Sequence, residues 1–263
     1  MALGDYGLPS MGMGLENARK SATLPFYFTM KSPEPTIVFD QKRAASYDQQ
    51  FAALAPIREA LHLQIRIILS ELPANANILC VGVGTGAELI YLAEAFPQWR
   101  FTAVEPAAPM LDICRRKTEE TGIASRCTFH QGYLDSLPAT DTFHAATCLL
   151  VSHFLVQIDE RRRFFRQIAT RLQPGGYLVS ADLTADMATA EYQSLLEVWL
   201  RMLRYAGLPA AEADKFRTSY GRDVALLPPE NIAAIITEAG FELPVLFYQS
   251  LLARAWYAHK RPE

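Results

Sequence analysis

Residues 78–89 read ILCVGVGTGAEL, a short apolar run followed by three closely spaced glycines and the start of a helical pattern. The run is too short for a helix and turn-forming residues bound it, which is typical of a strand buried on both faces. Gly82, Gly84 and Gly86 favour a tight turn, because glycine adopts backbone angles that other residues resist and lets a ligand approach the backbone. Such a loop brings a ligand to the N-terminus of the following helix.

A carboxylate follows this loop at the end of the next expected strand. Glu105 stands 23 positions after Gly82, directly behind the apolar run 101–104. At this place in an open α/β sheet a carboxylate can accept hydrogen bonds from both hydroxyls of a ribose. Glycines alone also fit tight packing, and Gly82, Gly84 and Ala87 fit the dinucleotide pattern G-x-G-x-x-A. Dinucleotide domains usually begin with this loop, however, whereas about 77 residues precede it here. Together with Glu105, the loop favours a nucleoside site.

Strands and helices alternate on both sides of the loop. Helices are expected at 57–72, 87–95, 109–121 and 160–172, and strands at 77–81, 100–104, 127–130, 143–150 and 177–181. Strands that alternate with helices of this length indicate βαβ units with right-handed crossovers. We therefore expect an α/β fold with a doubly wound, mostly parallel sheet and helices on both faces.

The chain divides into four expected parts. Residues 1–56 form an N-terminal arm and lid, in which glycines and prolines interrupt regular structure as far as residue 35. Residues 57–183 form the α/β core. The alternation stops after Asp182, so residues 184–229, with an apolar helix at 187–206 and a polar stretch behind it, are expected to form an inserted helical cap. Residues 230–263 complete the core with a helix at 230–239 and two strands at 243–249 and 252–259, which makes seven strands.

Composition narrows the class of protein. The chain has 263 residues, of which 50% are hydrophobic and 20% charged, with a formal net charge of -3. This profile excludes a disordered chain, and the charge argues against nucleic acid as a partner. No apolar run approaches the roughly 18 residues that span a bilayer, and the N-terminus lacks the order of a signal peptide, so we expect a cytoplasmic protein without membrane contact. The four cysteines lack C-x-x-C spacing, which predicts buried free thiols and no metal site. The arm and the apolar cap helix are compatible with a homodimer.

In this arrangement the chain resembles the class I S-adenosylmethionine-dependent methyltransferases. Residues 78–86 are similar to the first motif of that family, and Glu105-Pro106 with Met110 is similar to the second. Further similar segments follow in order, namely 130–135 (HQGYLD), 143–153 (FHAATCLLVSH) and 172–177 (LQPGGY). The resemblance covers residues 57 to 182. It implies S-adenosylmethionine as the cofactor, and a C-terminal hairpin that closes the sheet with a reversed last strand.

The resemblance also implies which residues bind the cofactor. In the family, the acidic residue binds the ribose, an apolar side chain packs on the adenine, and the loop after the third strand supports the adenine ring. The loop after the fourth strand lies beneath the methionine moiety, and in many members the segment that corresponds to 39–55 folds over the cofactor. The implied set is Tyr47, Gly82, Val83, Gly84, Gly86, Glu105, Pro106, Met110, Gly132, Tyr133, Leu134, Cys148 and Leu149.

Two positions depart from the family pattern. Cys80 stands where the first motif usually carries an acidic residue, and His144 stands where the fourth usually has aspartate. The missing carboxylate at Cys80 removes an acceptor for backbone amides, so either the cofactor is bound more weakly or the loop is held in another way. A looser similarity, through Phe39-Asp40, 238–242 and 247–249, points to the branch that contains carboxy-S-adenosylmethionine synthase. For the extra carboxylate of that ligand, the cap offers Arg217.

His153 and Asp182 are the candidate catalytic residues. His153 is expected at the mouth of the fourth strand, where it could act as a general base for an acceptor that loses a proton, or be a packed, hydrogen-bonded histidine. Asp182 ends the fifth strand and could orient an acceptor or cap the following turn. A base is optional, because holding the nucleophile and the methyl group in line already lowers the barrier. The basic run 161–163 is expected on a solvated helix face.

These observations favour a methyltransferase that acts on a small, partly aromatic or apolar metabolite by in-line displacement. The aromatic residues of the cap could wall an apolar pocket, although aromatic residues at helical spacing are also typical of a core. They are Tyr192, Trp199, Tyr205, Phe216 and Tyr220. Four alternatives stay open: an enzyme like carboxy-S-adenosylmethionine synthase, a tRNA-modifying enzyme, a nicotinamide-dependent oxidoreductase, and a binding protein with this fold but no turnover.

Overall fold

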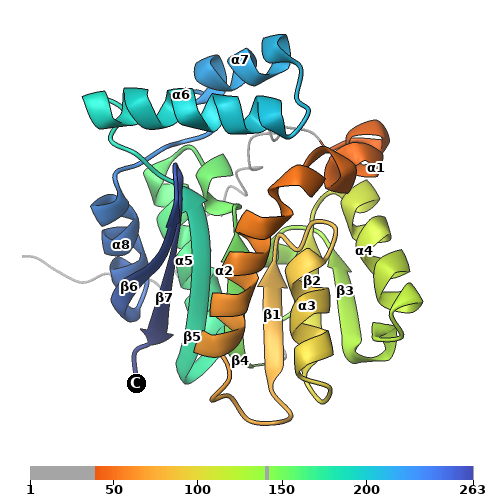
Figure 1. Ribbon diagram of the computed structural model, residues 1–263. Helices are drawn as coiled ribbons and strands as arrows, with labels where there is room; N and C mark the ends of the chain where they lie inside the picture. Colours follow the sequence, from red (N-terminus) through yellow and green to blue (C-terminus); the bar gives the residue numbers. More distant parts are fainter. Residues whose placement is uncertain (1–38, 140–141, 263) are drawn as a thin grey trace, which may run out of the picture. The chain divides into compact units, whose positions relative to one another are not determined.

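A seven-stranded sheet with the order β3-β2-β1-β4-β5-β7-β6 organises the chain (Figure 1). The computed structural model describes residues 39–139 and 142–262. The strands are β1 Asn77–Val81, β2 Arg100–Glu105, β3 Cys127–Gln131, β4 Phe143–Leu149, β5 Leu172–Leu183, β6 Phe241–Ser250 and β7 Ala253–Lys260. The first five strands pair in parallel, and β7 lies antiparallel to both β5 and β6. The mostly parallel sheet with a reversed last strand is therefore confirmed.

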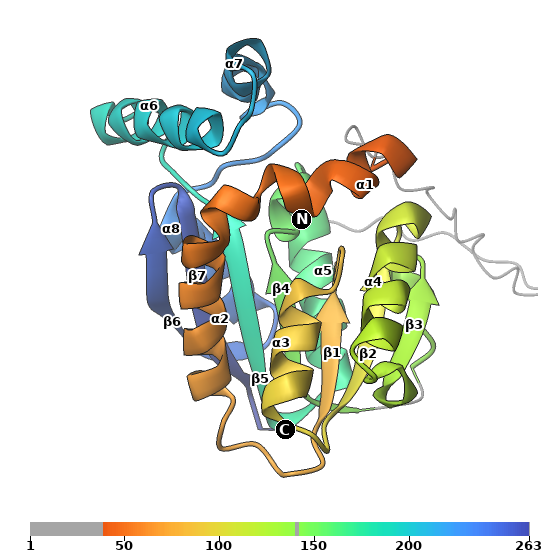
Figure 2. The ribbon, with the colours of Figure 1, turned by 45° about the vertical axis from the view of Figure 1, so that its right-hand side comes forward.

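Helices cover both faces of this sheet (Figures 1 and 2). They do so because successive apolar side chains of the central strands point to opposite faces. Ile78 and Cys80 of β1 face α2 (Ala55–Ile68), α3 (Ala87–Ala95) and α4 (Ala108–Glu120). Leu79 and Val81 face α5 (Ile158–Arg171) and α8 (Pro229–Glu238) on the other side. Each large apolar side chain that is fully buried in this way contributes about 1.5–3 kcal/mol. The short apolar run of β1 therefore fixes the strand at the centre of two hydrophobic layers.

Two helices, α6 (Ala190–Tyr205) and α7 (Ala210–Ser219), lie beyond the carboxyl end of β5 (Figure 1). The sequence predicts α6 but not α7, which occupies the stretch expected to be polar and irregular. Four of the five cap aromatic residues belong to a hydrophobic cluster of the cap itself, namely Tyr192, Trp199, Phe216 and Tyr220. Trp199 Nε1 donates a hydrogen bond to Tyr220 Oη at 2.8 Å. Tyr205 is 80% exposed, whereas the other four rings pack among the leucines and other apolar side chains of this cluster.

The helix α1 (Gln41–Gln50) crosses above the carboxyl ends of the central strands and packs against α4 (Figures 1 and 2). Asp40 caps its N-terminus, because the side chain accepts a hydrogen bond from Arg43 N–H at 2.8 Å. A one-turn helix η1 (Ala52–Leu54) then leads into α2. Of the expected arm and lid, residues 1–38 lie outside the described residues. Within the part of the chain that the structure describes, no helix is both long and apolar enough to cross a membrane.

Candidate functional site

The glycine loop between β1 and α3 has the backbone conformation that glycine alone adopts easily. Gly82, Gly84 and Gly86 have φ angles of 67°, 57° and 85°, in the left-handed region that costs other residues about 1–2 kcal/mol. A Cβ at Gly82 would lie 2.4 Å from a Val151 methyl, whereas a Cβ at Gly84 would come no closer than 3.6 Å to Met110. The loop is therefore packed tightly at Gly82 and has room for a ligand to approach at Gly84.

Glu105 connects this loop to the end of β2. One of its carboxylate oxygens, Oε2, accepts a hydrogen bond from Gly84 N–H at 3.0 Å, and Oε1 accepts one from Ala107 N–H at 3.0 Å. The side chain is buried, which raises its pKa, while the two amide donors act in the opposite direction. Met110 lies beside Gly84. The fold thus brings together the glycine loop, the acidic residue and the apolar residue of the expected nucleoside site.

The remaining expected cofactor residues lie around these three in different environments. Gly132 N–H donates to Glu105 O at 3.1 Å, and Tyr133 is 48% exposed next to it. Pro106 is exposed and Val83 is buried. Leu134 and Cys148 point into the hydrophobic layer beneath α5, and Leu149 packs on the opposite layer. Gly132 and Tyr133 therefore adjoin Glu105, whereas the side chains of Leu134 and Cys148 lie in the core.

The helix α1 contacts the same site from above. Burial raises the pKa of the Tyr47 hydroxyl, and the negative charges of Asp48 and Glu105 act in the same direction. Asp48 accepts a hydrogen bond from Thr85 Oγ1 of the glycine loop at 2.8 Å and forms an ion pair with Lys117 of α4. Sequence reasoning missed Asp48, because its partners come from distant parts of the chain and no motif marks it. Asp48 fastens α1 to the glycine loop and to α4.

Glu88 lies beneath the glycine loop, near Cys80, which stands in β1 where the family usually has an acidic residue. It is buried in the first turn of α3 and accepts a hydrogen bond from Thr147 Oγ1 at 3.2 Å. Burial raises the pKa of its carboxyl to about 7, while donation from Thr147 and from the amides of Glu88 and Leu89 acts in the opposite direction. Thr147 stands opposite Cys80 in the register of β4 and β1. A carboxyl group of α3 thus lies near the position in β1 where the family's acidic residue is missing.

The two candidate catalytic residues meet at the carboxyl ends of β4 and β5. Asp182 Oδ1 accepts a hydrogen bond from His153 N–H at 2.9 Å and contacts His153 Nδ1 at 3.2 Å, and Oδ2 accepts one from Ser152 Oγ at 2.6 Å. Leu183 N–H also lies 3.5 Å from His153 Nδ1. Nδ1 would have to donate to Asp182 but accept from Leu183. The contact with Asp182 is the shorter one, and a carboxylate can only accept, so the proton lies on Nδ1. In the neutral imidazole, Nε2 is then the nitrogen without a proton.

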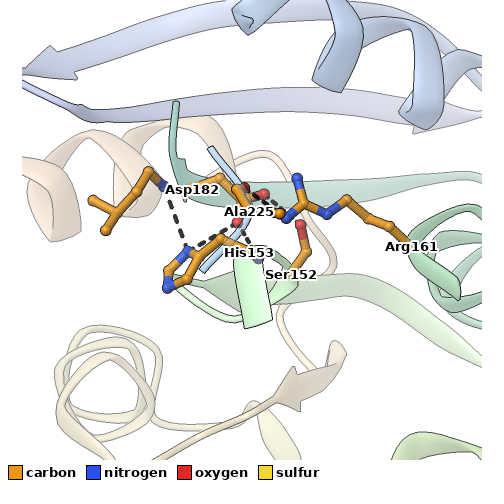
Figure 3. A network of polar contacts seen from close by, with 6 residues as sticks. Ser152, His153, Arg161, Asp182 and Ala225 are labelled. Atoms are coloured by element: carbon orange, nitrogen blue, oxygen red, sulfur yellow. Dashed lines mark hydrogen bonds and ion pairs between the residues drawn. The ribbon is translucent and has the colours of Figure 1, made fainter. Parts of the chain in front are cut away.

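Arg161 joins this cluster, which corrects the expectation that residues 161–163 form a solvated face. Its side chain is fully buried, while Arg162 and Arg163 lie on the surface. Arg161 Nη2 donates a hydrogen bond to Ala225 O at 3.0 Å (Figure 3). A signal for its burial was present, because Arg161 lies four residues before Phe165 and seven before Ile168. These three positions share one helix face, which packs against the sheet.

Two other features lie away from the cluster. Arg217, the candidate for an extra carboxylate, is on the surface of α7 and forms an ion pair with Glu197 at 2.7 Å. An open pocket of about 380 Å³ lies between α1, α2, α3 and α4, lined by Asp48, Ala52, Ala55, Arg58, Ala87 and Lys117. None of the expected cofactor residues lines it, so this pocket adjoins the glycine loop from outside.

Comparison with known proteins now identifies the domain. Residues 78–176 match the model of a family described as a methyltransferase domain. Residues 78–176 therefore form a class I S-adenosylmethionine-dependent methyltransferase domain. A carboxy-S-adenosylmethionine synthase from Campylobacter lari is 28% identical over 155 residues, which cover 58% of this chain and 64% of the synthase. A fatty-acid O-methyltransferase from Mycolicibacterium smegmatis is 30% identical over 129 residues, which cover 48% of this chain and 44% of that protein.

The fold agrees with this assignment. An O-methyltransferase family 2 protein from Planctomyces limnophilus, solved with apigenin, superposes with a TM-score of 0.55 at 17% identity, over 83% of this chain and 62% of that one. The chain covers 28% to 64% of the length of the curated relatives that it matches, which include the synthase and the fatty-acid O-methyltransferase above. The family match over residues 78–176 and the relatives above confirm the expected superfamily and cofactor, which leaves the nicotinamide-dependent alternative without support.

The residues of the methyltransferase domain fit S-adenosylmethionine. The loop leaves open space at Gly84, where a nucleoside must approach the backbone, and Glu105 presents a buried carboxylate beside it. Each oxygen of that carboxylate accepts one amide hydrogen bond and keeps a further lone pair for a ribose hydroxyl. Gly84, Glu105 and Met110 would therefore hold the adenosine.

Proposed function

We propose that the protein transfers a methyl group from S-adenosylmethionine to a hydroxyl group of a small, partly apolar metabolite. The observation that carries this proposal is the buried His153–Asp182 pair at the carboxyl ends of β4 and β5. In open α/β sheets ligands bind at this edge of the sheet. A hydroxyl acceptor has to lose its proton, and a histidine whose Nδ1–H is directed at a carboxylate is suited to take it.

The roles of the residues follow from their contacts. Bound S-adenosylmethionine supplies a methyl group activated by a sulfonium. Asp182 accepts the Nδ1–H of His153 and so leaves Nε2 free to take the acceptor's proton. Ser152 donates to the second oxygen of Asp182, which keeps the carboxylate oriented. The buried carboxylate then stabilises the imidazolium that proton transfer creates.

The chemistry of the acceptor is inferred from the surface beside this pair. Four apolar side chains of the segment 150–158, which contains His153, are 38% to 42% exposed, namely Leu150, Phe154, Val156 and Ile158. The Phe154 ring also lies 4.4 Å from the His153 ring, between centroids. Apolar surface with a few convergent polar groups is typical of small-molecule sites. The similarity to a fatty-acid O-methyltransferase is consistent with such an acceptor.

The proposal is tested with methyl-labelled S-adenosylmethionine and a panel of phenols, hydroxy acids, fatty acids and amines. We expect transfer to a hydroxyl compound, and we expect His153→Gln to lower kcat by about 10²–10⁴-fold with little change in cofactor affinity. His259→Gln is the matched control, because His259 lies on β7 and contacts Gly175 O. Equal loss in both variants, or transfer only to amines, would contradict the proposal.

A second candidate function is a reaction like that of carboxy-S-adenosylmethionine synthase, which the similarity to such synthases favours. Arg217 is engaged with Glu197 on the surface and therefore does not support it. Mass spectrometry of the ligand that co-purifies with the protein distinguishes the two, because the carboxylated cofactor is heavier by one carboxyl group. A tRNA-modifying enzyme would bind RNA with an affinity that falls steeply with salt, which the net charge of -3 does not favour. A binding protein without turnover would bind the cofactor and methylate nothing in the panel.

A further inference from the structure

The segment that leads from the cap back to the core is held between two elements of the site. We call residues 220–228 the return segment. Ala225 N–H donates a hydrogen bond to His153 O at 2.8 Å, and Ala225 O accepts one from Arg161 Nη2 at 3.0 Å. Both backbone groups of one residue are thus used, one by the loop that carries His153 and the other by α5 (Figure 3). The return segment is therefore bonded directly to the loop that carries His153, and Arg161 ties the same residue of the segment to α5.

Arg161 also acts on the carboxylate of the pair. Burial lowers the pKa of its guanidinium, and the negative charge of Asp182 acts in the opposite direction. A buried carboxylate is costly unless charges and hydrogen bonds compensate it. Asp182 has its hydrogen bonds from Ser152 and His153, and Arg161 supplies a buried positive charge nearby. Arg161 therefore influences the pair both through the return segment and through its charge.

We propose that Arg161 is a positioning residue, which holds the return segment against the His153–Asp182 pair and so fixes the tautomer and orientation of the His153 ring. This inference rests on the proposed function, because it assigns a role within the same site. Without Arg161, the oxygen of Ala225 loses its partner and Asp182 loses a compensating charge. The return segment then loosens, and the His153 ring, whose main chain is bonded to Ala225, is held less firmly with Nδ1 at Asp182.

The contacts of Arg161 define which substitutions are informative. Its Nε and Nη1 atoms have no hydrogen-bond partner among the described residues, so the link to Ala225 depends on Nη2. Arg161→Lys retains a positive charge and a donor and should restore the parent behaviour in part. Arg161→Met retains the length of the stem and removes both. Arg162→Met is the matched control, because Arg162 lies on the same helix as Arg161 but on its surface, where it pairs with Asp159 of α5 and with Glu238 of α8.

The first experiment is nitrogen NMR of protein labelled in its five histidines, with the signals of His153 assigned through His153→Gln. We expect the parent, Arg161→Lys and Arg162→Met to show the Nδ1-protonated form of His153, and Arg161→Met to show a mixture of tautomers. Hydrogen exchange measured on the same variants should be faster for the Ala225 amide only in Arg161→Met. If Arg161→Met does not fold, Arg161→Gln replaces it, because glutamine also lacks the charge.

The second experiment is kinetic. With any acceptor found in the panel, Arg161→Met should lower kcat by about 10-fold to 100-fold, less than the removal of the base itself, while the Kd for S-adenosylmethionine stays within about twofold of the parent. Parent-like histidine signals and parent-like exchange at Ala225 in a folded neutral variant would overturn the proposal. If no compound is methylated, the proposed function fails, whereas the NMR and exchange data still decide the role of Arg161.

Discussion

Replacement of Glu105 by glutamine should weaken the binding of every ligand that carries the adenosine of the cofactor. The two carboxylate oxygens each accept a backbone N–H, from Gly84 and from Ala107, at 3.0 Å. Glutamine is neutral and has only one side-chain oxygen, so its NH2 group faces one of these N–H donors. A ribose hydroxyl then loses its charged acceptor. A hydrogen bond to a charged group is worth about 1.5–3 kcal/mol, which corresponds to a Kd that rises about 10-fold to 150-fold.

Calorimetric titration with both S-adenosylmethionine and S-adenosylhomocysteine measures this effect. The two ligands share the adenosine and differ at the sulfur, so a carboxylate that binds the sugar must affect both by the same factor. Glu94→Gln is the control, because Glu94 is an exposed carboxylate on α3. The reasoning is refuted if a folded Glu105→Gln protein binds both ligands within about twofold of the parent, or loses affinity for S-adenosylmethionine alone.

Three further predictions concern the same region. Burial raises the pKa of Glu88 to about 7, against an ordinary value of 4.5, so the stability that its protonated form contributes is complete below pH 4.5 and is lost as the pH rises through about 7. Between pH 5 and pH 8 the parent should therefore lose about 2–3 kcal/mol of unfolding free energy relative to Glu88→Gln, as measured by urea unfolding. Asp48→Ala removes one hydrogen bond and one partly exposed ion pair, which together contribute about 1–2 kcal/mol. Dissociation of S-adenosylmethionine, measured by stopped flow, should therefore become about 5-fold to 30-fold faster. The control Asp112→Ala, at an exposed residue, should leave this rate unchanged. Gly84→Ala should lose cofactor affinity at a stability cost of about 1–2 kcal/mol, whereas Gly82→Ala should lose clearly more stability in thermal unfolding, because its Cβ would lie 2.4 Å from a methyl group.

The sequence predicts the parts of the site that depend on short-range order. The strand, the glycines and the helix of 78–95 follow each other without interruption, and Glu105 ends the next strand, so local patterns suffice to place them together. His153 and Asp182 could be assigned to neighbouring strand ends for the same reason. Their hydrogen bond could not, because it depends on the turn of the chain after β4, where Leu150 adopts a positive φ of 60°.

The parts that depend on distant segments were beyond local patterns. The helix face shared with Phe165 and Ile168 indicates that Arg161 is buried, but its hydrogen-bond partner, Ala225 O, lies 64 positions further along the chain. The helix α7 has few apolar residues and is stabilised by packing on α6, with Ala213 fully buried between them. Asp48 gains its role from Thr85 and Lys117, which belong to two other elements. In each case tertiary contacts, and not propensity, determine the local structure.

The bonds between the return segment and the histidine loop have a consequence for how such a protein diversifies. Because Ala225 uses only its main chain for both bonds, they impose no particular side chain there. The sequence of the cap can then drift, and recognition of new acceptors can evolve, while His153, the proposed base, keeps its place. In this architecture the selectivity of the enzyme and its chemistry are open to separate selection.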